Sequence, residues 1–381
     1  MEKFSKWRDP GTGIQPFLPP VPAQTGASIQ LYAYKAITAV ASISRCAVLA
    51  VSAILRVILV GIPEKVLAWS PVLAWKVTRI PNAVLCRFGL FLMGYWWIST
   101  EVVQVKRVRG TQTVKVDVKP GDVIVSNWTG YVDILYLAFR FNPTYLLPIH
   151  EPVHPTSGST TPLRADFQGY AAVNLSTVLS LTGHTPSTFL TRLSSHPIYP
   201  TIVEARAACS GRPLVVFPEG TTSNARGLLR FAQGCLSDVE VPVRGYNVWV
   251  MFFKHPSPTP YTPTATHSAP NTTLNPLPHI ANTITQSLLP RNLNVRILHP
   301  YNSPSSGSFL PSETLDLNAT MSNQNVMGEC CAVLLRQLGR AKSVGLGWED
   351  KDGFLVFLRE RRPIGGGAIG SGRKVGKSGT R

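Results

Sequence analysis

One acidic residue stands in a tight turn with hydroxyl groups and arginines close behind it. The stretch is FPEGTTSNARGLLRF, residues 217–231, and its first residue ends a short apolar run that is typical of a buried strand. A carboxylate accepts hydrogen bonds from alcohols, and a guanidinium fork suits a phosphate. Taken alone, Pro-Glu-Gly favours a plain surface turn, so the significance of this stretch depends on the rest of the chain. The candidate binding residues that this stretch offers are Glu219, Gly220, Thr221, Arg226 and Arg230.

Two stretches of the chain together resemble the glycerolipid acyltransferases of the lysophosphatidic acid acyltransferase type. The first is FPEGTTS, with GLLRF just after it and Val241-Pro242-Val243 downstream, and the second is SNWTGYVDILYL at 126–137. In that family the Phe-Pro-Glu-Gly-Thr turn binds the glycerol hydroxyls of the substrate. A block of the form His, four residues, Asp carries the catalysis. The resemblance covers about residues 90 to 300 and implies that the catalytic positions here are Asp133 and Trp128.

The residue at the histidine position of that block departs from the family. In the family the histidine takes the proton from the lysolipid hydroxyl, and the aspartate orients the imidazole. Trp128 cannot act as this base, because an indole N–H donates a hydrogen bond and has no basic lone pair. General-base catalysis contributes roughly 10²–10⁴-fold, so we expect a weakened enzyme or a base from elsewhere. His150 and His154 follow the next predicted strand and are the candidates for a substitute base.

The phosphate-binding position of the family is also changed. Many members have an arginine where this chain has Thr222, and that arginine contacts the phosphate of the lysolipid. The resemblance implies that Arg226 or Arg230 supplies the positive charge instead. The alternative is that both arginines are solvated loop cations.

Composition favours a membrane-associated protein with a globular part. Of the 381 residues 44% are hydrophobic and only 15% are charged, and the formal net charge is +17. Such an excess of positive charge suits a polyanion, either a nucleic acid or an anionic membrane surface. The basic residues flank the apolar N-terminal third, and there is no zinc-finger spacing or RNA-binding signature, so we expect no nucleic-acid partner. The six cysteines show no metal-ligand spacing and indicate a reducing compartment.

Residues 31–100 are predicted to form helical segments that dock on a membrane. The apolar run 31–62 places Thr38, Arg45, Ser52 and Arg56 on one narrow stripe of a helix, which favours a helix embedded in one leaflet over a lone span. A second apolar run ends in Trp96 and Trp97, which suit the headgroup layer. The alternative is a buried core helix of an ordinary globular domain.

The rest of the chain alternates between strand-like and helical patterns. We expect an α/β domain at 101–345, a mixed sheet covered by helices, with strands that include 123–125, 144–149, 214–217, 239–243, 246–253 and 294–298. Helices are predicted at 131–141 and 319–342. Residues 1–30 are polar and proline-rich, 151–166 and 255–279 are loop insertions with little sign of order, and 346–381 form a C-terminal segment with a basic, glycine-rich tail.

The expected function is transfer of a fatty acyl group from acyl-CoA to a lysophospholipid, most simply lysophosphatidic acid. The resemblance implies no metal and no bound cofactor, with acyl-CoA as a co-substrate and membrane lipids as partners. It places the protein at the cytosolic face of the endoplasmic reticulum or of a lipid droplet. The alternative, which rests on Trp128, is an inactive or weakened protein of the same fold that binds lipids or acts as a scaffold.

Overall fold

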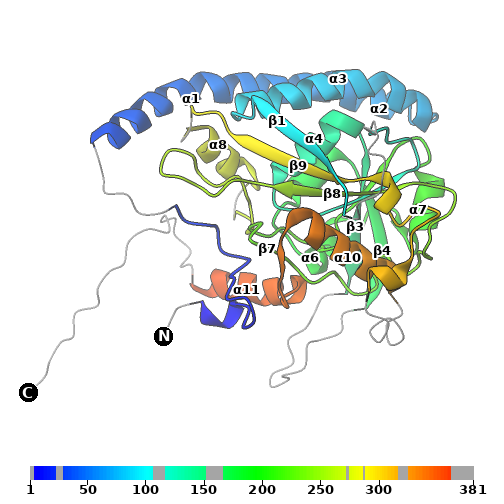
Figure 1. Ribbon diagram of the computed structural model, residues 1–381. Helices are drawn as coiled ribbons and strands as arrows, with labels where there is room; N and C mark the ends of the chain where they lie inside the picture. Colours follow the sequence, from blue (N-terminus) through cyan, green and yellow to red (C-terminus); the bar gives the residue numbers. More distant parts are fainter. Residues whose placement is uncertain are drawn as a thin grey trace, which may run out of the picture.

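An eight-stranded mixed sheet forms the centre of the computed structural model (Figure 1). The structure describes residues 4–22, 29–105, 116–151, 166–271, 274–285, 288–315 and 325–361. Across the sheet the strands run in the order β1-β9-β8-β2-β6-β3-β4-β5. Their bounds are β1 Trp97–Val103, β2 Val123–Ser126, β3 Thr144–His150, β4 Phe167–Val173, β5 Ile198–Tyr199, β6 Leu214–Val216, β8 Val248–Lys254 and β9 Asn292–Leu298. A separate two-stranded sheet pairs β7 Gly227–Leu228 with β10 Lys342–Ser343.

Four neighbouring strands in the middle of the large sheet are parallel. Strand β2 pairs with β8 on one side and with β6 on the other, and β6 pairs with β3. Their valines, leucines and isoleucines are buried, as is usual for parallel strands with helices on both faces. The antiparallel strands β9, next to β8, and β4, next to β3, widen the sheet. The predicted mixed sheet covered by helices is confirmed.

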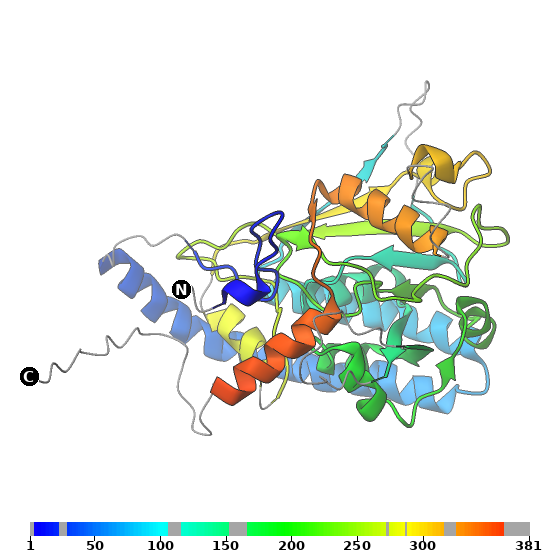
Figure 2. The same cartoon turned by 90° about the horizontal axis from the view of Figure 1, so that it is seen from below.

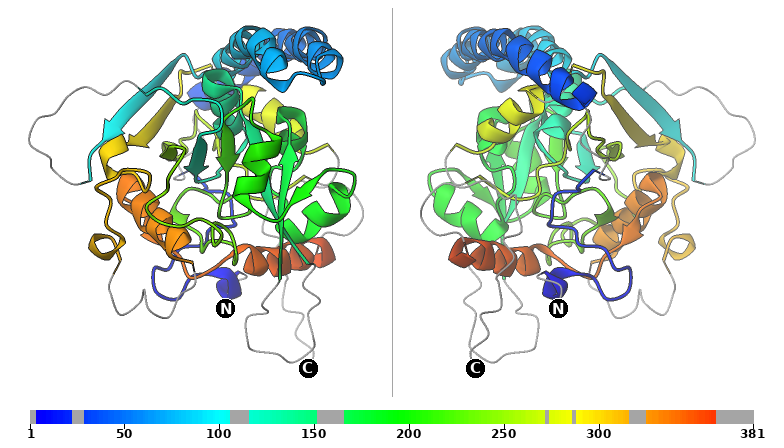
Figure 3. Two further views of the ribbon diagram at one scale, coloured as in Figure 1. Left: turned by 90° about the vertical axis from the view of Figure 1, so that its right-hand side faces the viewer. Right: turned by 90° about the vertical axis from the view of Figure 1, so that its left-hand side faces the viewer.

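Helices pack on both faces of this sheet (Figure 3). One face is covered by α3 Pro71–Leu92, α4 Tyr131–Phe141, α5 Leu175–Ser180, α6 Pro186–Arg192 and α8 Leu277–Thr285. The other is covered by α7 Ile202–Ala208 and α10 Val326–Gly339. The last described helix, α11 Trp348–Arg361, packs beside the N-terminal segment 4–22 (Figure 2), where Phe17 and Phe354 lie 5.8 Å apart between ring centroids. Short 3-10 turns complete the described elements: η1 Ser5–Trp7, η3 Pro300–Asn302 and η4 Pro311–Glu313.

A long apolar helix lies outside α3 and forms a layer with it across one side of the molecule (Figures 1 and 3). Helix α1 Ile29–Arg56 continues through η2 Val57–Gly61 and α2 Ile62–Val66. Among the described residues this is the one helix long and apolar enough to cross a membrane, judged by length and composition, and only 11% of its most apolar window is buried. It is therefore not the buried core helix that was the alternative.

The α1–α3 layer buries several hydroxyl groups of α1 and leaves many of its apolar side chains exposed. Thr38 and Ser52 of the predicted stripe are buried, and the guanidinium of Arg56 donates to Asn82 Oδ1 at 3.0 Å. Buried hydroxyls in α1 donate to carbonyls of their own helix, so they need no outside partner. Outward-facing residues of these helices such as Ile43, 73% exposed, and Ile80, 71% exposed, leave a large apolar surface uncovered, and Trp97 at the start of β1 is 81% exposed.

Three sequence predictions need correction in the described residues. Residues 239–243 form no strand but an irregular segment, in which Val243 N donates to Pro304 O. Much of 255–279 is packed rather than loosely ordered, because Ala265, Thr266, His267 and Ser268 are all buried. The helix predicted at 319–342 begins only at Val326 in the described part of the chain. Residues 152–165, 316–324 and 362–381 lie outside the described residues, together with the predicted basic tail.

Candidate functional site

The ends of three neighbouring parallel strands bring the polar residues together. Strand β2 leads to Trp128 and Asp133, β6 leads to Glu219, and β8 leads to His255. Since β2 lies between β8 and β6, the loops after all three strands meet at the carboxyl edge of the sheet. Ligand sites of α/β proteins are commonly found at this edge.

Asp133 is fully buried at the start of α4 and accepts every hydrogen bond that its carboxylate makes. Its Oδ2 receives the backbone N–H and the hydroxyl of Thr129, at 2.8 and 2.6 Å, and the N–H of Gly130 at 3.3 Å. The positive end of the helix dipole also favours a negative charge here. The carboxylate is therefore held in a fixed position.

The other oxygen of Asp133 contacts a histidine that sequence reasoning missed. Nε2 of His255 lies 2.8 Å from Asp133 Oδ1, and the imidazole is 2% exposed. Its other ring nitrogen, Nδ1, is buried and has no hydrogen-bond partner among the described residues. An imidazole that is oriented by a carboxylate and has one free nitrogen is able to accept a proton.

Asn127 fixes the end of β8 against the end of β2. Its side-chain amide donates to Phe253 O at 3.1 Å, and its carbonyl oxygen accepts from Phe253 N at 2.7 Å. Because Phe253 is two residues before His255, these two hydrogen bonds fix the position of the backbone that carries the imidazole. Asn127 directly precedes Trp128 in the sequence but gave no signal of this role.

Trp128 fills core space and does not hydrogen-bond to Asp133. Its side chain is fully buried and stacks on Phe217, with ring centroids 4.9 Å apart. Its indole Nε1 has no hydrogen-bond partner among the described residues. The backbone of Trp128 contributes to the site through its carbonyl, which accepts from Ser223 N at 3.1 Å and ties the two loops together.

Glu219 is buried and only half satisfied. Its Oε2 accepts from Leu229 N at 3.2 Å, whereas its Oε1 has no partner among the described residues. Burial raises the pKa of Glu219 to about 8, and the N–H groups of Leu229 and Trp128 offset this only in part. Near neutral pH the side chain is therefore mostly a neutral carboxylic acid, which presents one free oxygen to the site.

The turn after Glu219 is held by a second residue that sequence reasoning missed. The ammonium of Lys351, on α11, donates to Thr221 Oγ1 at 2.7 Å and to the carbonyl of Thr222 at 2.8 Å. Burial lowers the pKa of Lys351 well below its ordinary value, while the nearby Glu219 carboxyl favours the charged form. Gly220 adopts a φ of 67°, which favours glycine, and a Cβ there would lie 2.9 Å from Pro186 Cγ.

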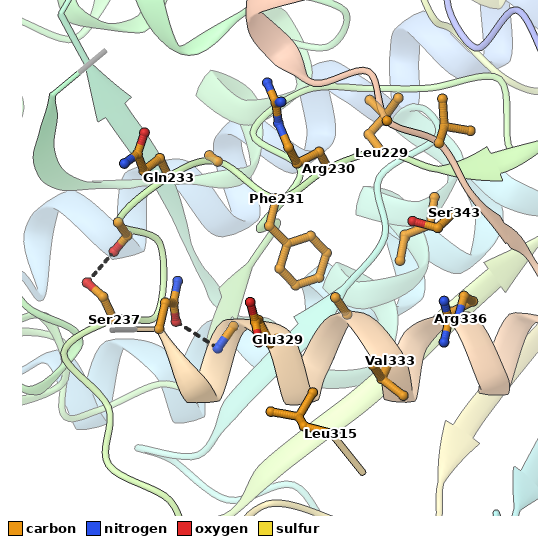
Figure 4. A pocket seen from close by; sticks show the side chains of 18 of the residues that line it. Leu229, Arg230, Phe231, Gln233, Ser237, Leu315, Glu329, Val333, Arg336 and Ser343 are labelled. Carbon is orange, nitrogen blue, oxygen red and sulfur yellow. Dashed lines mark hydrogen bonds between the residues drawn. The ribbon is translucent and has the colours of Figure 1, made fainter. Parts of the chain in front are cut away.

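The two arginines predicted to bind phosphate lie at the surface. Arg226 is exposed, and Arg230 is exposed and pairs with Glu349 at 3.2 Å. Arg230 also lines a groove of about 1120 Å³ between the segment after β7 and helix α10 (Figure 4). Arg336 of α10 lines the same groove, and its guanidinium makes no hydrogen bond or ion pair with another described residue. Leu229, which donates to Glu219, forms part of the groove wall, so groove and turn share one segment.

His150, one of the two histidines predicted as substitute bases, does not contact Asp133. His150 ends β3, and its Nε2 lies 2.8 Å from Gln233 O. Strand β6 lies between β3 and β2, so the end of β3 is two strand spacings, roughly 10 Å, from the end of β2. His154 lies outside the described residues. The described residues also contain no group of three His, Cys, Asp or Glu side chains that could hold a metal ion.

Comparison with known proteins gives one informative relative. The chain is 25% identical over 356 residues to a Schizosaccharomyces pombe protein named "Putative lysophosphatidic acid:oleoyl-CoA acyltransferase", and the alignment covers 93% of this chain and 97% of that protein. No family model matches the chain, and no solved structure matches it. The similarity extends over most of the chain and supports a relationship to an acyltransferase family.

Proposed function

We propose that the protein transfers a fatty acyl group from acyl-CoA to lysophosphatidic acid and so makes phosphatidic acid. The observation that carries the proposal is Glu219, a buried carboxyl with one unpaired oxygen. It lies at the same carboxyl edge of the sheet as the buried Asp133. A buried polar atom without a partner is costly, and a substrate hydroxyl would satisfy it. The name of the S. pombe relative supports the same reaction.

The two substrates differ in solubility, and the molecule offers each a separate side. The apolar α1–α3 layer would rest on the membrane that supplies the lysolipid, at the cytosolic face of the endoplasmic reticulum or a lipid droplet. Helix α10, whose residues line one wall of the groove, lies on the side of the molecule away from this layer (Figures 1 and 3). A ligand in the groove would be reached from water, so Arg230 and Arg336 suit the phosphates of acyl-CoA better than the lysolipid headgroup. The proposed reaction uses acyl-CoA as a co-substrate and no metal or prosthetic group.

An acyl-CoA consumption assay on the purified full chain tests this proposal. Release of free CoA thiol is followed with a panel of lysophospholipids in mixed micelles, and the lipid product is identified by mass. We expect turnover that depends on the acceptor and is greatest with lysophosphatidic acid. Asp133→Asn serves as the inactive control, because it removes the carboxylate that faces His255. Turnover that does not depend on any acceptor would refute acyl transfer to a lysolipid.

The second candidate function is lipid binding without catalysis. The observation that favours it is Trp128, whose buried indole takes the family's histidine position and has no proton-accepting nitrogen. This candidate predicts that lysophosphatidic acid binds while no acceptor supports turnover. The assay above therefore separates the two functions.

A further inference from the structure

We propose that His255 is the catalytic base of this protein, supplied by the end of β8 instead of the block that contains Trp128. The inference rests on the proposed function, because it assigns the proton acceptor for the same acyl transfer. It also removes the main reason to regard the chain as inactive, which was the absence of a histidine at position 128.

The hydrogen-bond pattern fixes which nitrogen of His255 is available. Asp133 accepts from Thr129 and Gly130 at Oδ2, so its Oδ1 is left to accept from the imidazole. A carboxylate can only accept, so the Nε2 of His255 carries the proton and donates it at 2.8 Å. In the neutral ring the lone pair then lies on Nδ1, the atom without a partner among the described residues. The base is thus oriented, and its lone pair is free.

The position of His255 follows from strand order and not from chance contact. Strands β8 and β2 are direct neighbours, with Ser126 opposite Met251, and Asn127 clamps Phe253. The loop after β2 carries Asp133, so the residue just after β8 is placed to meet it. His150 ends a strand on the far side of β6 and lacks this adjacency.

Several other groups around the site are weak proton acceptors. Burial lowers the pKa of His184 to about 3, of His267 to about 4 and of His279 to about 3, so their lone pairs bind protons weakly. Glu219 is mostly protonated near neutral pH, for the reason given above. Asp133 already accepts four hydrogen bonds, one of them from His255 itself.

The step proceeds with a balanced exchange of bonds and protons. The lysolipid hydroxyl oxygen attacks the thioester carbonyl while its proton passes to His255 Nδ1, and Asp133 stabilises the imidazolium that results. The new C–O bond forms, the C–S bond breaks, and the departing CoA sulfur takes the proton back from Nδ1. The products are the acylated lipid and CoA thiol, and the imidazole returns to its neutral form.

The test compares two matched substitutions in the purified full chain. His255→Gln keeps an amide N–H that can donate to Asp133 but removes the basic nitrogen, whereas His150→Gln makes the same change at the end of β3. We expect His255→Gln to lower kcat by roughly 10²–10⁴-fold with KM for both substrates unchanged. His150→Gln should retain kcat within about twofold, because only the loss of the general base is expected to lower kcat by the larger factor. Thermal unfolding of each variant checks that the fold is intact.

Chemical rescue gives a readout that a structural role would not produce. In His255→Ala the imidazole is removed and a buried space is left, so added free imidazole should restore part of the lost turnover. The same imidazole should not accelerate the wild type or His150→Gln. Turnover that survives His255→Gln would overturn this assignment and leave the acyltransferase function standing. Absence of turnover in the wild type with every acceptor would overturn the function and, with it, the assignment.

Discussion

Replacing Glu219 with glutamine is expected to make the protein more stable and less active. The folded protein keeps this carboxyl protonated up to a pKa of about 8, against an ordinary value of 4.5. Between these two values the unfolded chain releases the proton and the folded chain holds it. The free energy of unfolding therefore falls as pH rises through this window, by about 1.4 kcal/mol per pH unit. Glutamine does not titrate and does not carry this penalty.

The size of the stability gain follows from the pH. At pH 7 the pH is about 2.5 units above the pKa of the carboxyl in the unfolded chain. Glu219→Gln should therefore raise the free energy of unfolding by an amount on the order of 3 kcal/mol. It should vanish near pH 4.5 and reach its maximum above pH 8. Chemical denaturation of wild type and variant at pH 5, 6, 7 and 8 measures the difference, in which the other titrating groups cancel. Glu240→Gln, at an exposed carboxylate, is the matched control.

The loss of activity in the same variant has a separate cause. Leu229 N donates to Oε2 of Glu219, so an amide must keep its oxygen there and turn its NH₂ group toward the position of Oε1. An NH₂ group only donates, whereas the wild-type oxygen can also accept from a substrate hydroxyl. We expect a rise in KM for the lysolipid and a lower kcat/KM in the release of CoA thiol. A stability difference that is flat across pH would refute the buried neutral carboxyl, and wild-type kinetics would refute its role in substrate binding.

Four further predictions address other parts of the molecule. Trp128→His should not raise turnover, because both oxygens of Asp133 already accept hydrogen bonds, and loss of the stacked indole should lower the free energy of unfolding by roughly 2–3 kcal/mol. Denaturation and kinetics test this, and turnover above wild type would contradict it. Lys351→Ala should lower the free energy of unfolding by at least about 2 kcal/mol, because it leaves the buried carbonyl of Thr222 without the donor that Lys351 provides. Denaturation measures this loss, and Lys342→Ala, at an exposed lysine, is the control. Equal effects of the two substitutions would argue against this. The double variant Ile43→Gln/Val51→Gln should weaken binding to lipid vesicles by tenfold or more, because each apolar side chain buried in the membrane contributes about 1.5 kcal/mol to binding. Leu310→Gln, at an exposed apolar residue elsewhere, should not weaken it. Unchanged co-sedimentation would count against a membrane-facing α1. Arg336→Gln should raise KM for acyl-CoA several-fold and leave KM for the lysolipid unchanged, with the exposed Arg244→Gln as control. A change confined to the lysolipid would reassign the groove.

The parts of the fold that the sequence made predictable are those with local signals. Strands β2, β6 and β8 are short apolar runs bounded by turn residues, and helix α4 has a continuous apolar face. Asp133 and Glu219 stand where such runs end, so their place at the sheet edge was predictable. Whether these two bind substrate stays a prediction for the kinetic tests above.

The missed residues have no local signal, because they depend on strand order and on distant contacts. The sequence shows β3 directly after α4, which makes His150 look close to Asp133, but the sheet inserts β6 between β2 and β3. His255 begins a segment without periodicity that resembles a loosely ordered insertion. That segment is held instead by side-chain contacts to backbone, such as Ser268 Oγ to Phe17 O at 2.8 Å. Lys351 lies in a helix with no apolar stripe to mark its buried position.

The location of Lys351 bears on the order of events during synthesis. The turn that presents Glu219 is held by an ammonium from the last described helix, and Asn224 beside that turn donates to Gln15 O and Leu18 O near the other end of the described chain. A ribosome therefore delivers the apolar helix α1 early and the residue that secures the Glu219 turn late. The apolar surface of α1 is thus exposed long before the site is assembled. A nascent chain that stops short of α11 would therefore carry the exposed apolar helix while the Glu219 turn lacks the lysine that holds it.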